Sequence, residues 1–159
     1  MEDKVRYVKL DVEIDEPIAD LIIELNRNHL QTKFCCCGHE MTTQIILHGS
    51  CHEPEYIPVK NDHPHIYITF ANYDLTNGFV EYLRNMLTDG ILENRDGSFI
   101  KYKIKKEYAH VLTQFRTEYN DNKDEITIRL YYTPNNFEES RQYAVECLNK
   151  GLNKFIENV

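Results

Sequence analysis

Apolar and polar residues alternate at the start of the chain, and the alternation then changes to a helical period. Within Val5–Ile14, apolar side chains occupy every second position from Val8 onward, the spacing of a half-buried β-strand. The next residues are Asp15, Glu16 and Pro17, and an acidic first turn with an early proline favours the start of a helix. Apolar residues then recur at helical spacing until the pattern fades near residues 26–28; they are Ile18, Leu21, Ile22 and Leu25.

Three apolar runs bounded by turn-forming residues predict β-strands in the rest of the first half. They span residues 31–37, 44–47 and 65–70. Between the last two runs, the stretch 50–64 holds three prolines and scattered charges, which predicts a loop. A second helical stripe follows, with Asn72 or Asp74 as its cap and the pair Asp89-Gly90 as its stop.

The second half of the chain is richer in strand patterns. They span residues 91–93, 99–105, 111–118 and 126–133. The first two flank Asn94-Arg95-Asp96-Gly97, a hairpin signal with glycine at the turn. The chain ends in a helical pattern, for which we expect Thr133 as cap and Pro134 at the first position. Because short turns join most neighbouring strands, we expect an α+β fold: a single, mainly antiparallel sheet with about three helices packed on it, in one domain over residues 1–159.

Length, charge and hydropathy narrow the classes of function. The 159 residues carry a formal net charge of −8, which argues against binding to duplex nucleic acid because phosphate contacts need a basic field. No apolar run reaches the length of a membrane span, and residues 1–11 have no apolar signal-peptide core. We therefore expect no membrane partner and a cytoplasmic location.

Cysteine and histidine are concentrated in one segment, which suggests metal binding. Residues 35–65 hold nine of the chain's twelve Cys and His residues. Neighbouring cysteines on a strand point to opposite faces, so the three consecutive ones do not indicate a disulfide framework. Zinc takes four such ligands in tetrahedral geometry. The candidate ligands are Cys35, Cys37, His39, Cys51 and His52. In the alternative interpretation, the cysteines are small core residues and the histidines belong to a polar loop.

A short motif carries a resemblance to a group of known proteins. A helix leads into Thr32-Lys33-Phe34-Cys35-Cys36-Cys37-Gly38-His39, and a later strand contains Tyr67-Ile68-Thr69-Phe70. Over roughly residues 15–70 this arrangement resembles small proteins encoded by phages and prophages of Firmicutes. It is more loosely similar to the tRNA wybutosine-synthesis methyltransferase family, which has an S-C-S-G turn where this chain has Cys36-Cys37-Gly38.

The phage-like resemblance implies a binding role. Small phage proteins of this kind include anti-Thoeris and anti-CBASS sponges, which sequester nucleotide signals, are typically oligomers and carry out no catalysis. A nucleotide pocket needs an aromatic ring, amide groups and arginines for the phosphates. The candidate ligand-binding residues are Cys37, Gly38, His39, Phe70, Asn72, Arg116 and Arg129. The alternative is that Phe70 belongs to the core, Asn72 only caps a helix and both arginines face solvent.

These observations together predict a non-enzymatic, homo-oligomeric binding protein. Its expected ligand is a small nucleotide-derived anion, sequestered in phage counter-defence in the host cytoplasm, and no cofactor is required. Two alternatives stay open: a zinc-binding protein that uses the Cys/His-rich segment 35–65, and a protein-interaction module that inhibits a host enzyme.

Overall fold

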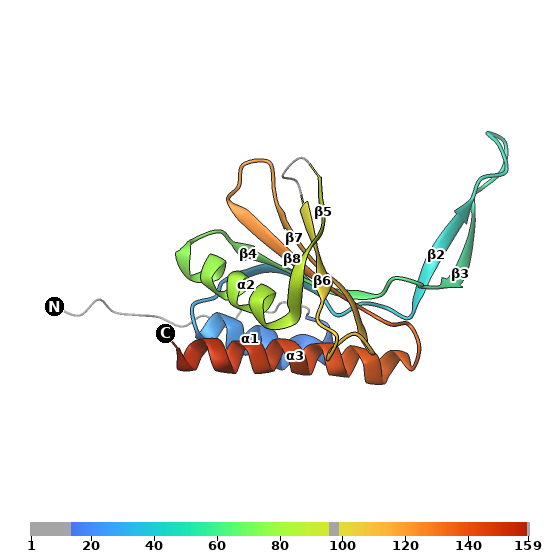
Figure 1. The fold of residues 1–159 in the computed structure, drawn as a ribbon. Coiled ribbons are helices and arrows are strands. Elements are labelled where there is room, and N and C mark those ends of the chain that lie inside the picture. The colour runs from blue at the N-terminus through green and yellow to red at the C-terminus, as the bar shows by residue number, and fades with distance from the viewer. Residues whose placement is uncertain (1–13, 96–98, 159) are drawn as a thin grey trace.

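The computed structural model describes residues 14–95 and 99–158 (Figure 1). Within these residues the chain forms three α-helices, one short 3-10 turn and eight β-strands. The helical elements are η1 (Glu16–Ile18), α1 (Ala19–Arg27), α2 (Asp74–Leu87) and α3 (Phe137–Glu157). The strands are β1 (Thr32–Cys36), β2 (Met41–Ile46), β3 (Glu55–Lys60), β4 (His65–Ala71), β5 (Thr88–Arg95), β6 (Phe99–Ile104), β7 (Leu112–Tyr119) and β8 (Glu125–Tyr132).

The described strands form one large antiparallel sheet and one small one. The main sheet has six strands in the order β1-β4-β8-β7-β6-β5, and every neighbouring pair is antiparallel. The second sheet contains only β2 and β3. The predicted α+β class, with a mainly antiparallel sheet and three helices, is confirmed. The predicted strand over Val5–Ile14 lies outside the described residues up to position 13, and Ile14 belongs to no element.

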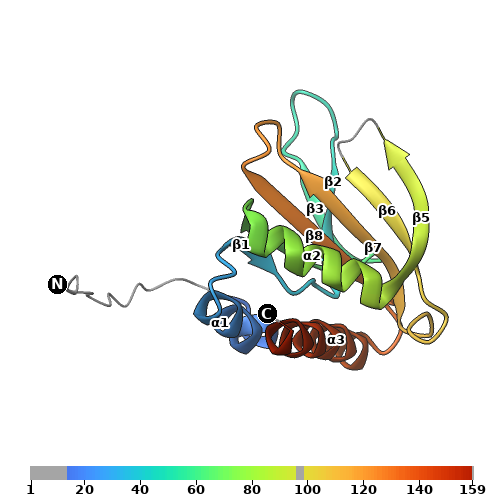
Figure 2. The ribbon, with the colours of Figure 1, turned by 60° about the vertical axis from the view of Figure 1, so that its left-hand side comes forward.

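All three helices pack on one face of the main sheet (Figure 2). Alternation along the neighbouring strands β4 and β8 produces this face, because every second side chain of each strand is buried against the helices. The buried side chains are Ile66, Ile68, Phe70, Ile126, Ile128, Leu130 and Tyr132. They contact apolar stripes of the helices that include Leu21, Leu25, Phe79, Leu83, Leu148 and Leu152. Each fully buried side chain of this size contributes about 1.5–3 kcal/mol of transfer free energy.

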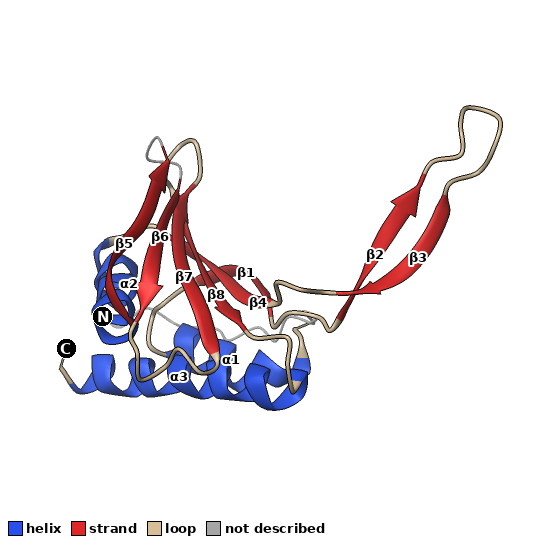
Figure 3. Cartoon of the chain, turned by 45° about the vertical axis from the view of Figure 1, so that its right-hand side comes forward, coloured by secondary structure: helices blue, strands red, loops and turns tan. Residues whose placement is uncertain are grey.

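The opposite face of the main sheet, which no helix of the described residues covers, is the open face (Figure 3). Side chains on it alternate with the core residues, so β8 alone presents Glu125, Thr127, Arg129 and Tyr131 there. Within the described residues, no helix is both long enough and apolar enough to cross a bilayer.

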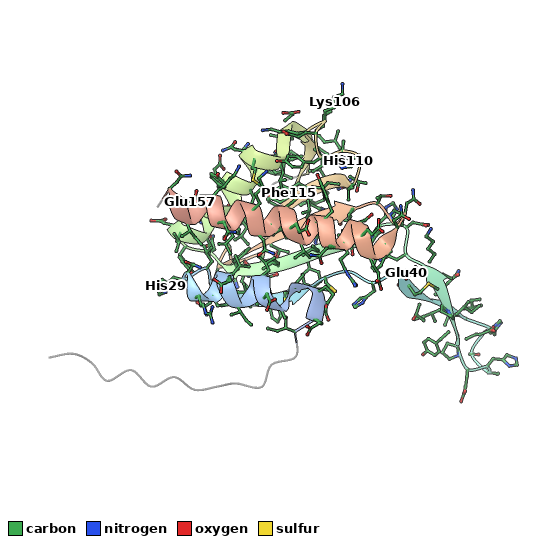
Figure 4. All side chains as sticks on the ribbon, turned by 90° about the horizontal axis from the view of Figure 1, so that it is seen from below. His29, Glu40, Lys106, His110, Phe115 and Glu157 are labelled. Carbon is green, nitrogen blue, oxygen red and sulfur yellow. The ribbon has the colours of Figure 1, made fainter. Side chains whose placement is uncertain are left out.

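Strands β2 and β3 form a hairpin that extends away from the body of the protein (Figures 1 and 3). Figure 4 labels Glu40 at its base. The loop expected over residues 50–64 is therefore wrong, since β3 occupies residues 55–60. Pro58 lacks an N–H and usually excludes a central strand, but both strands of a two-stranded sheet are edges, where proline is tolerated.

Two predicted helix boundaries are also wrong. Helix α2 ends at Leu87 and the chain continues directly into β5, so Asp89 and Gly90 lie in a strand and do not terminate the helix. Helix α3 begins at Phe137 and not near Pro134, because Asn136 has a left-handed backbone conformation, with φ of +49°, and interrupts the helical path there. The other predicted helices and strands agree with the structure to within a few residues. Residues 96 and 97 of the predicted hairpin turn lie outside the described residues.

Candidate functional site

A row of charged and aromatic side chains crosses the open face. The register places Tyr67 opposite Arg129, Arg129 opposite Arg116, and Arg116 opposite Lys101. Directly opposed residues of antiparallel strands project from the same face, with Cβ atoms about 4.5–5.5 Å apart. The sequence therefore places three cationic side chains side by side, from strands β8, β7 and β6.

Arg129 is held by three neighbours. Its Nε donates to Glu118 Oε1 at 2.6 Å, and its Nη1 lies 3.0 Å from His65 Nε2. Its guanidinium carbon also lies 5.1 Å from the centre of the Tyr67 ring, within the range of a cation–π contact. The guanidinium is thus fixed in orientation before any ligand binds.

Arg116 has weaker polar partners. Its guanidinium stacks on the Phe99 ring at 3.7 Å, and Nη1 lies 3.4 Å from the Tyr131 hydroxyl. Its buried Nε has no hydrogen-bond partner in the described structure; the Glu118 carboxylate is 3.8 Å away. Among the described ion pairs, Glu118 is the carboxylate that both arginines share, so the pair keeps a net positive charge.

His65 lies next to Arg129 in this row and is a neutral imidazole. Its ring stacks on Tyr131 with centroids 4.4 Å apart. Nδ1 lies 3.1 Å from the carbonyl of His63, so this nitrogen carries the proton and Nε2 accepts from Arg129. Burial, together with the positive charges of Arg129 and Arg116, lowers the pKa of His65.

A tightly built turn follows β1. Gly38 has a φ of +88°, in the region that favours glycine, and it packs against the Tyr132 hydroxyl and the His65 backbone. The Tyr132 hydroxyl donates to the Cys37 carbonyl at 2.8 Å. Burial raises the pKa of the Cys37 thiol to about 11, so this thiol is protonated at neutral pH.

Three potential metal ligands meet beside this turn. One donor atom each from Asp15, Cys36 and His39 lies within 4.8 Å of the other two. Cys36 Sγ is 3.5 Å from His39 Nε2, and Asp15 Oδ2 accepts the Cys37 N–H at 3.0 Å. That hydrogen bond lowers the pKa of Asp15, whereas burial raises the pKa of the Cys36 thiol.

Comparisons with known proteins return no match: no protein-family model, no curated protein and no solved structure matches the chain. Inferences about function therefore rest on the geometry of the chain's own residues.

The structure brings together only part of the predicted ligand-binding set. Arg116 and Arg129 are directly opposed, as their adjacent strands indicated. Phe70 is fully buried on the core side, where its ring meets Phe79. Asn72 lies at the far end of β4, where its amide donates to the Lys123 carbonyl at 2.6 Å. Neither Phe70 nor Asn72 faces the arginines.

The predicted zinc ligands are dispersed. Cys35 packs against the core, and the Cys37 thiol is buried with the Gly38 carbonyl 3.4 Å away. Cys51 and His52 are exposed in the loop that joins β2 to β3, which is the tip of the hairpin. The hairpin extends away from the body of the protein (Figure 3). Of the five candidates, only His39 belongs to the Asp15–Cys36–His39 cluster.

Sequence reasoning missed three residues that matter here. The sequence pattern places Asp15 at the start of a helix, and Cys36 is not among the candidate zinc ligands. The pattern assigns no role to Phe34, yet Phe34 lies opposite Thr69 on the open face and its exposed fraction is 61%. Phe34 lies two residues before Cys36 on the same strand, so the alternation of a strand predicts that the two side chains share one face.

Proposed function

We propose that the chain is a non-enzymatic binding protein that holds a phosphate-bearing, nucleotide-like anion on the open face. The observation that carries the proposal is the directly opposed pair Arg116 and Arg129, which share the single carboxylate of Glu118. Guanidinium groups present several N–H donors in a fork that matches phosphate oxygens.

The aromatic side chain that suits base stacking is Phe34, in place of the buried Phe70. It projects from β1, two strands away from Arg129 in the order β1-β4-β8. Two strand spacings amount to about 10 Å, a separation that a nucleotide spans between its base and its outer phosphate. A base on Phe34 would thus place phosphates near the arginines.

The charge distribution supports a small ligand. The whole chain carries −8, whereas the row on the open face contains Arg129, Arg116 and Lys101. Lys101 pairs with Glu93 at 3.3 Å, and the two arginines share Glu118, so the row keeps a local excess of positive charge. A local patch suits a compact anion better than a long polyanion, which also meets the acidic surroundings.

Calorimetry with three probes tests the proposal: tripolyphosphate, ADP and adenosine. We expect both phosphorylated probes to bind and adenosine to bind far more weakly. Arg129→Gln and Arg116→Gln should each raise the Kd for ADP by at least about tenfold, because a hydrogen bond to a charged group is lost. Arg27→Gln is the matched control, since Arg27 is an exposed arginine on the helical side. Failure of both phosphorylated probes to bind would overturn the proposal.

The proposed absence of catalysis requires a separate measurement of the bound ligand. After heat denaturation of the complex, mass spectrometry should recover the bound ADP unchanged. A hydrolysed or transferred product would show that the face is catalytic. We place the binding in phage counter-defence because of the resemblance of residues 15–70, and expect the purified chain to lower the free concentration of a nucleotide signal without consuming it.

A second candidate function is capture and inhibition of a host enzyme through the hairpin. The exposed apolar side chains of the hairpin favour it, since large exposed apolar patches mark interaction sites. They are Met41, Ile45, Leu47 and Tyr56. This function predicts a host complex that survives Arg129→Gln and is lost when residues 41–60 are removed; the opposite pattern would assign capture to the open face.

A further inference from the structure

We propose that Asp15, Cys36 and His39 bind one zinc ion at the turn after β1, with the fourth coordination position open. The three donor atoms come from different parts of the chain: the residue before η1, the end of β1, and the residue after Gly38. All lie within 4.8 Å of one another. This site differs from the ligand set that the sequence suggested, and it does not depend on the proposed function.

The spacing of the donors fits a tetrahedral zinc centre. Zinc binds thiolate sulfur at about 2.3 Å and imidazole nitrogen at about 2.0–2.1 Å, so two such ligands at a tetrahedral angle lie about 3.5 Å apart. Cys36 Sγ and His39 Nε2 are separated by 3.5 Å. One edge of the coordination shell therefore already has the required length.

The surrounding backbone holds the ligands in place. Asp15 Oδ2 is bound by the Cys37 N–H, which fixes the carboxylate and leaves its other oxygen for a metal. The Asn61 amide donates to the His39 carbonyl at 3.0 Å, and Tyr132 donates to the Cys37 carbonyl at 2.8 Å. These two hydrogen bonds fix the backbone from which the Cys36 and His39 side chains project.

The chemistry of the donors selects the ion. A sulfur, a nitrogen and a carboxylate oxygen form a borderline-soft set, which suits zinc, whereas magnesium and calcium require oxygen ligands. A thiolate from Cys36 and the carboxylate of Asp15 together balance the two charges of zinc, and His39 binds as a neutral ligand. His39 is exposed, so the ion can enter from solvent.

Equilibrium dialysis of the full chain against zinc chloride, with metal analysis, tests the site. We expect about one zinc per chain for the unaltered protein. Cys36→Ser and His39→Ala should each weaken zinc binding at least about tenfold. The matched controls are Cys51→Ser and His52→Ala, which alter the same residue types at the hairpin tip and should keep full binding. Absence of zinc from the unaltered protein would overturn the proposal, as would loss of zinc in the hairpin controls only.

Two further measurements guard against loss of folding in the variants. Asp15→Asn keeps an oxygen for the Cys37 N–H but removes the charge, so it should stay folded by circular dichroism and still bind zinc more weakly. Cobalt loaded in place of zinc should give a thiolate-to-metal absorption band that disappears in Cys36→Ser and persists in Cys51→Ser. Persistence of the band in Cys36→Ser would contradict the assignment. Arg129→Gln, which tests the anion site, should leave zinc binding unchanged.

Discussion

Gly38 determines the shape of the turn after β1. A Cβ at this position would meet the Tyr132 hydroxyl and would lie 2.9 Å from the His65 carbonyl oxygen, and φ is +88°. Gly38→Ala should therefore lower the free energy of unfolding by about 2–4 kcal/mol, because a left-handed conformation and overcrowding both add a cost. Urea denaturation measures the loss.

Gly49→Ala is the control for this substitution. Gly49 also has a positive φ, +97°, but nothing lies within 4 Å of its Cβ position. Only local backbone strain applies, and Gly49 lies in the exposed loop between β2 and β3, so the global free energy of unfolding should change little. Equal losses for the two variants would contradict the crowding at Gly38.

His65 makes the stability of the folded chain depend on pH. Burial lowers its pKa below the ordinary value of 6.5, so the unfolded chain takes up a proton before the folded chain does. Stability is therefore present above about pH 6.5 and declines as pH falls below it. Between about pH 7.5 and 5.5, the unaltered protein should lose more free energy of unfolding than His65→Gln, which has no imidazole to protonate. The same pH dependence in both proteins would show that His65 contributes nothing.

At the residue scale, strand pairing could be predicted but side-chain direction could not. Arg116 and Arg129 lie on strands joined by a short turn, so their opposition followed from a hairpin pattern. Phe70 could face either side of β4, and only the packed structure places it among the core residues. Asp15 and Cys37 are 22 residues apart, and no local pattern predicts their hydrogen bond.

Among the elements, those with strong periodicity agree with expectation and those governed by an unusual local environment do not. Strands β4, β7 and β8 alternate clearly because one of their faces is buried. Strand β3 has no buried face, and Pro58 interrupts its pattern, so its sequence resembles a loop. Its strand conformation depends on pairing with β2. The periodicity of a single segment carries no information about such pairing.

The hairpin formed by β2 and β3 should be dispensable for the stability of the body. Every residue from 41 to 60 is exposed or half-buried, and the Asn61 N–H donates to the Glu40 carbonyl at 2.8 Å across the hairpin base. Replacing residues 41–60 by two glycines should therefore preserve cooperative thermal unfolding, with little change in Tm by circular dichroism. Phe115→Ala, which empties a fully buried position of β7, should by contrast cost about 3–5 kcal/mol. Loss of cooperative unfolding in the deletion would mean that the hairpin supports the core.

On the scale of the whole molecule, a compact ligand and an extended ligand interact with different sets of charges. The Debye length at about 0.15 M salt is about 8 Å, so a compact anion on the open face interacts mainly with the arginines and Glu118. A duplex extends well beyond the row and meets more of a surface whose net charge is −8. The local positive charge of the arginines and the negative net charge of the chain together favour a nucleotide over a nucleic acid.

Two probes should give opposite results at the same ionic strength. At about 0.15 M salt, ADP should bind in calorimetry, whereas a short labelled DNA duplex should show no change in fluorescence anisotropy. Raising the salt concentration should weaken ADP binding gradually, because few phosphates are neutralised and the slope of log K against log salt depends on their number. The double variant Arg116→Gln, Arg129→Gln should abolish ADP binding and leave the duplex result unchanged. If the duplex instead binds through these arginines with a steep salt dependence, the open face recognises a polyanion and the local excess of positive charge outweighs the net charge of the chain.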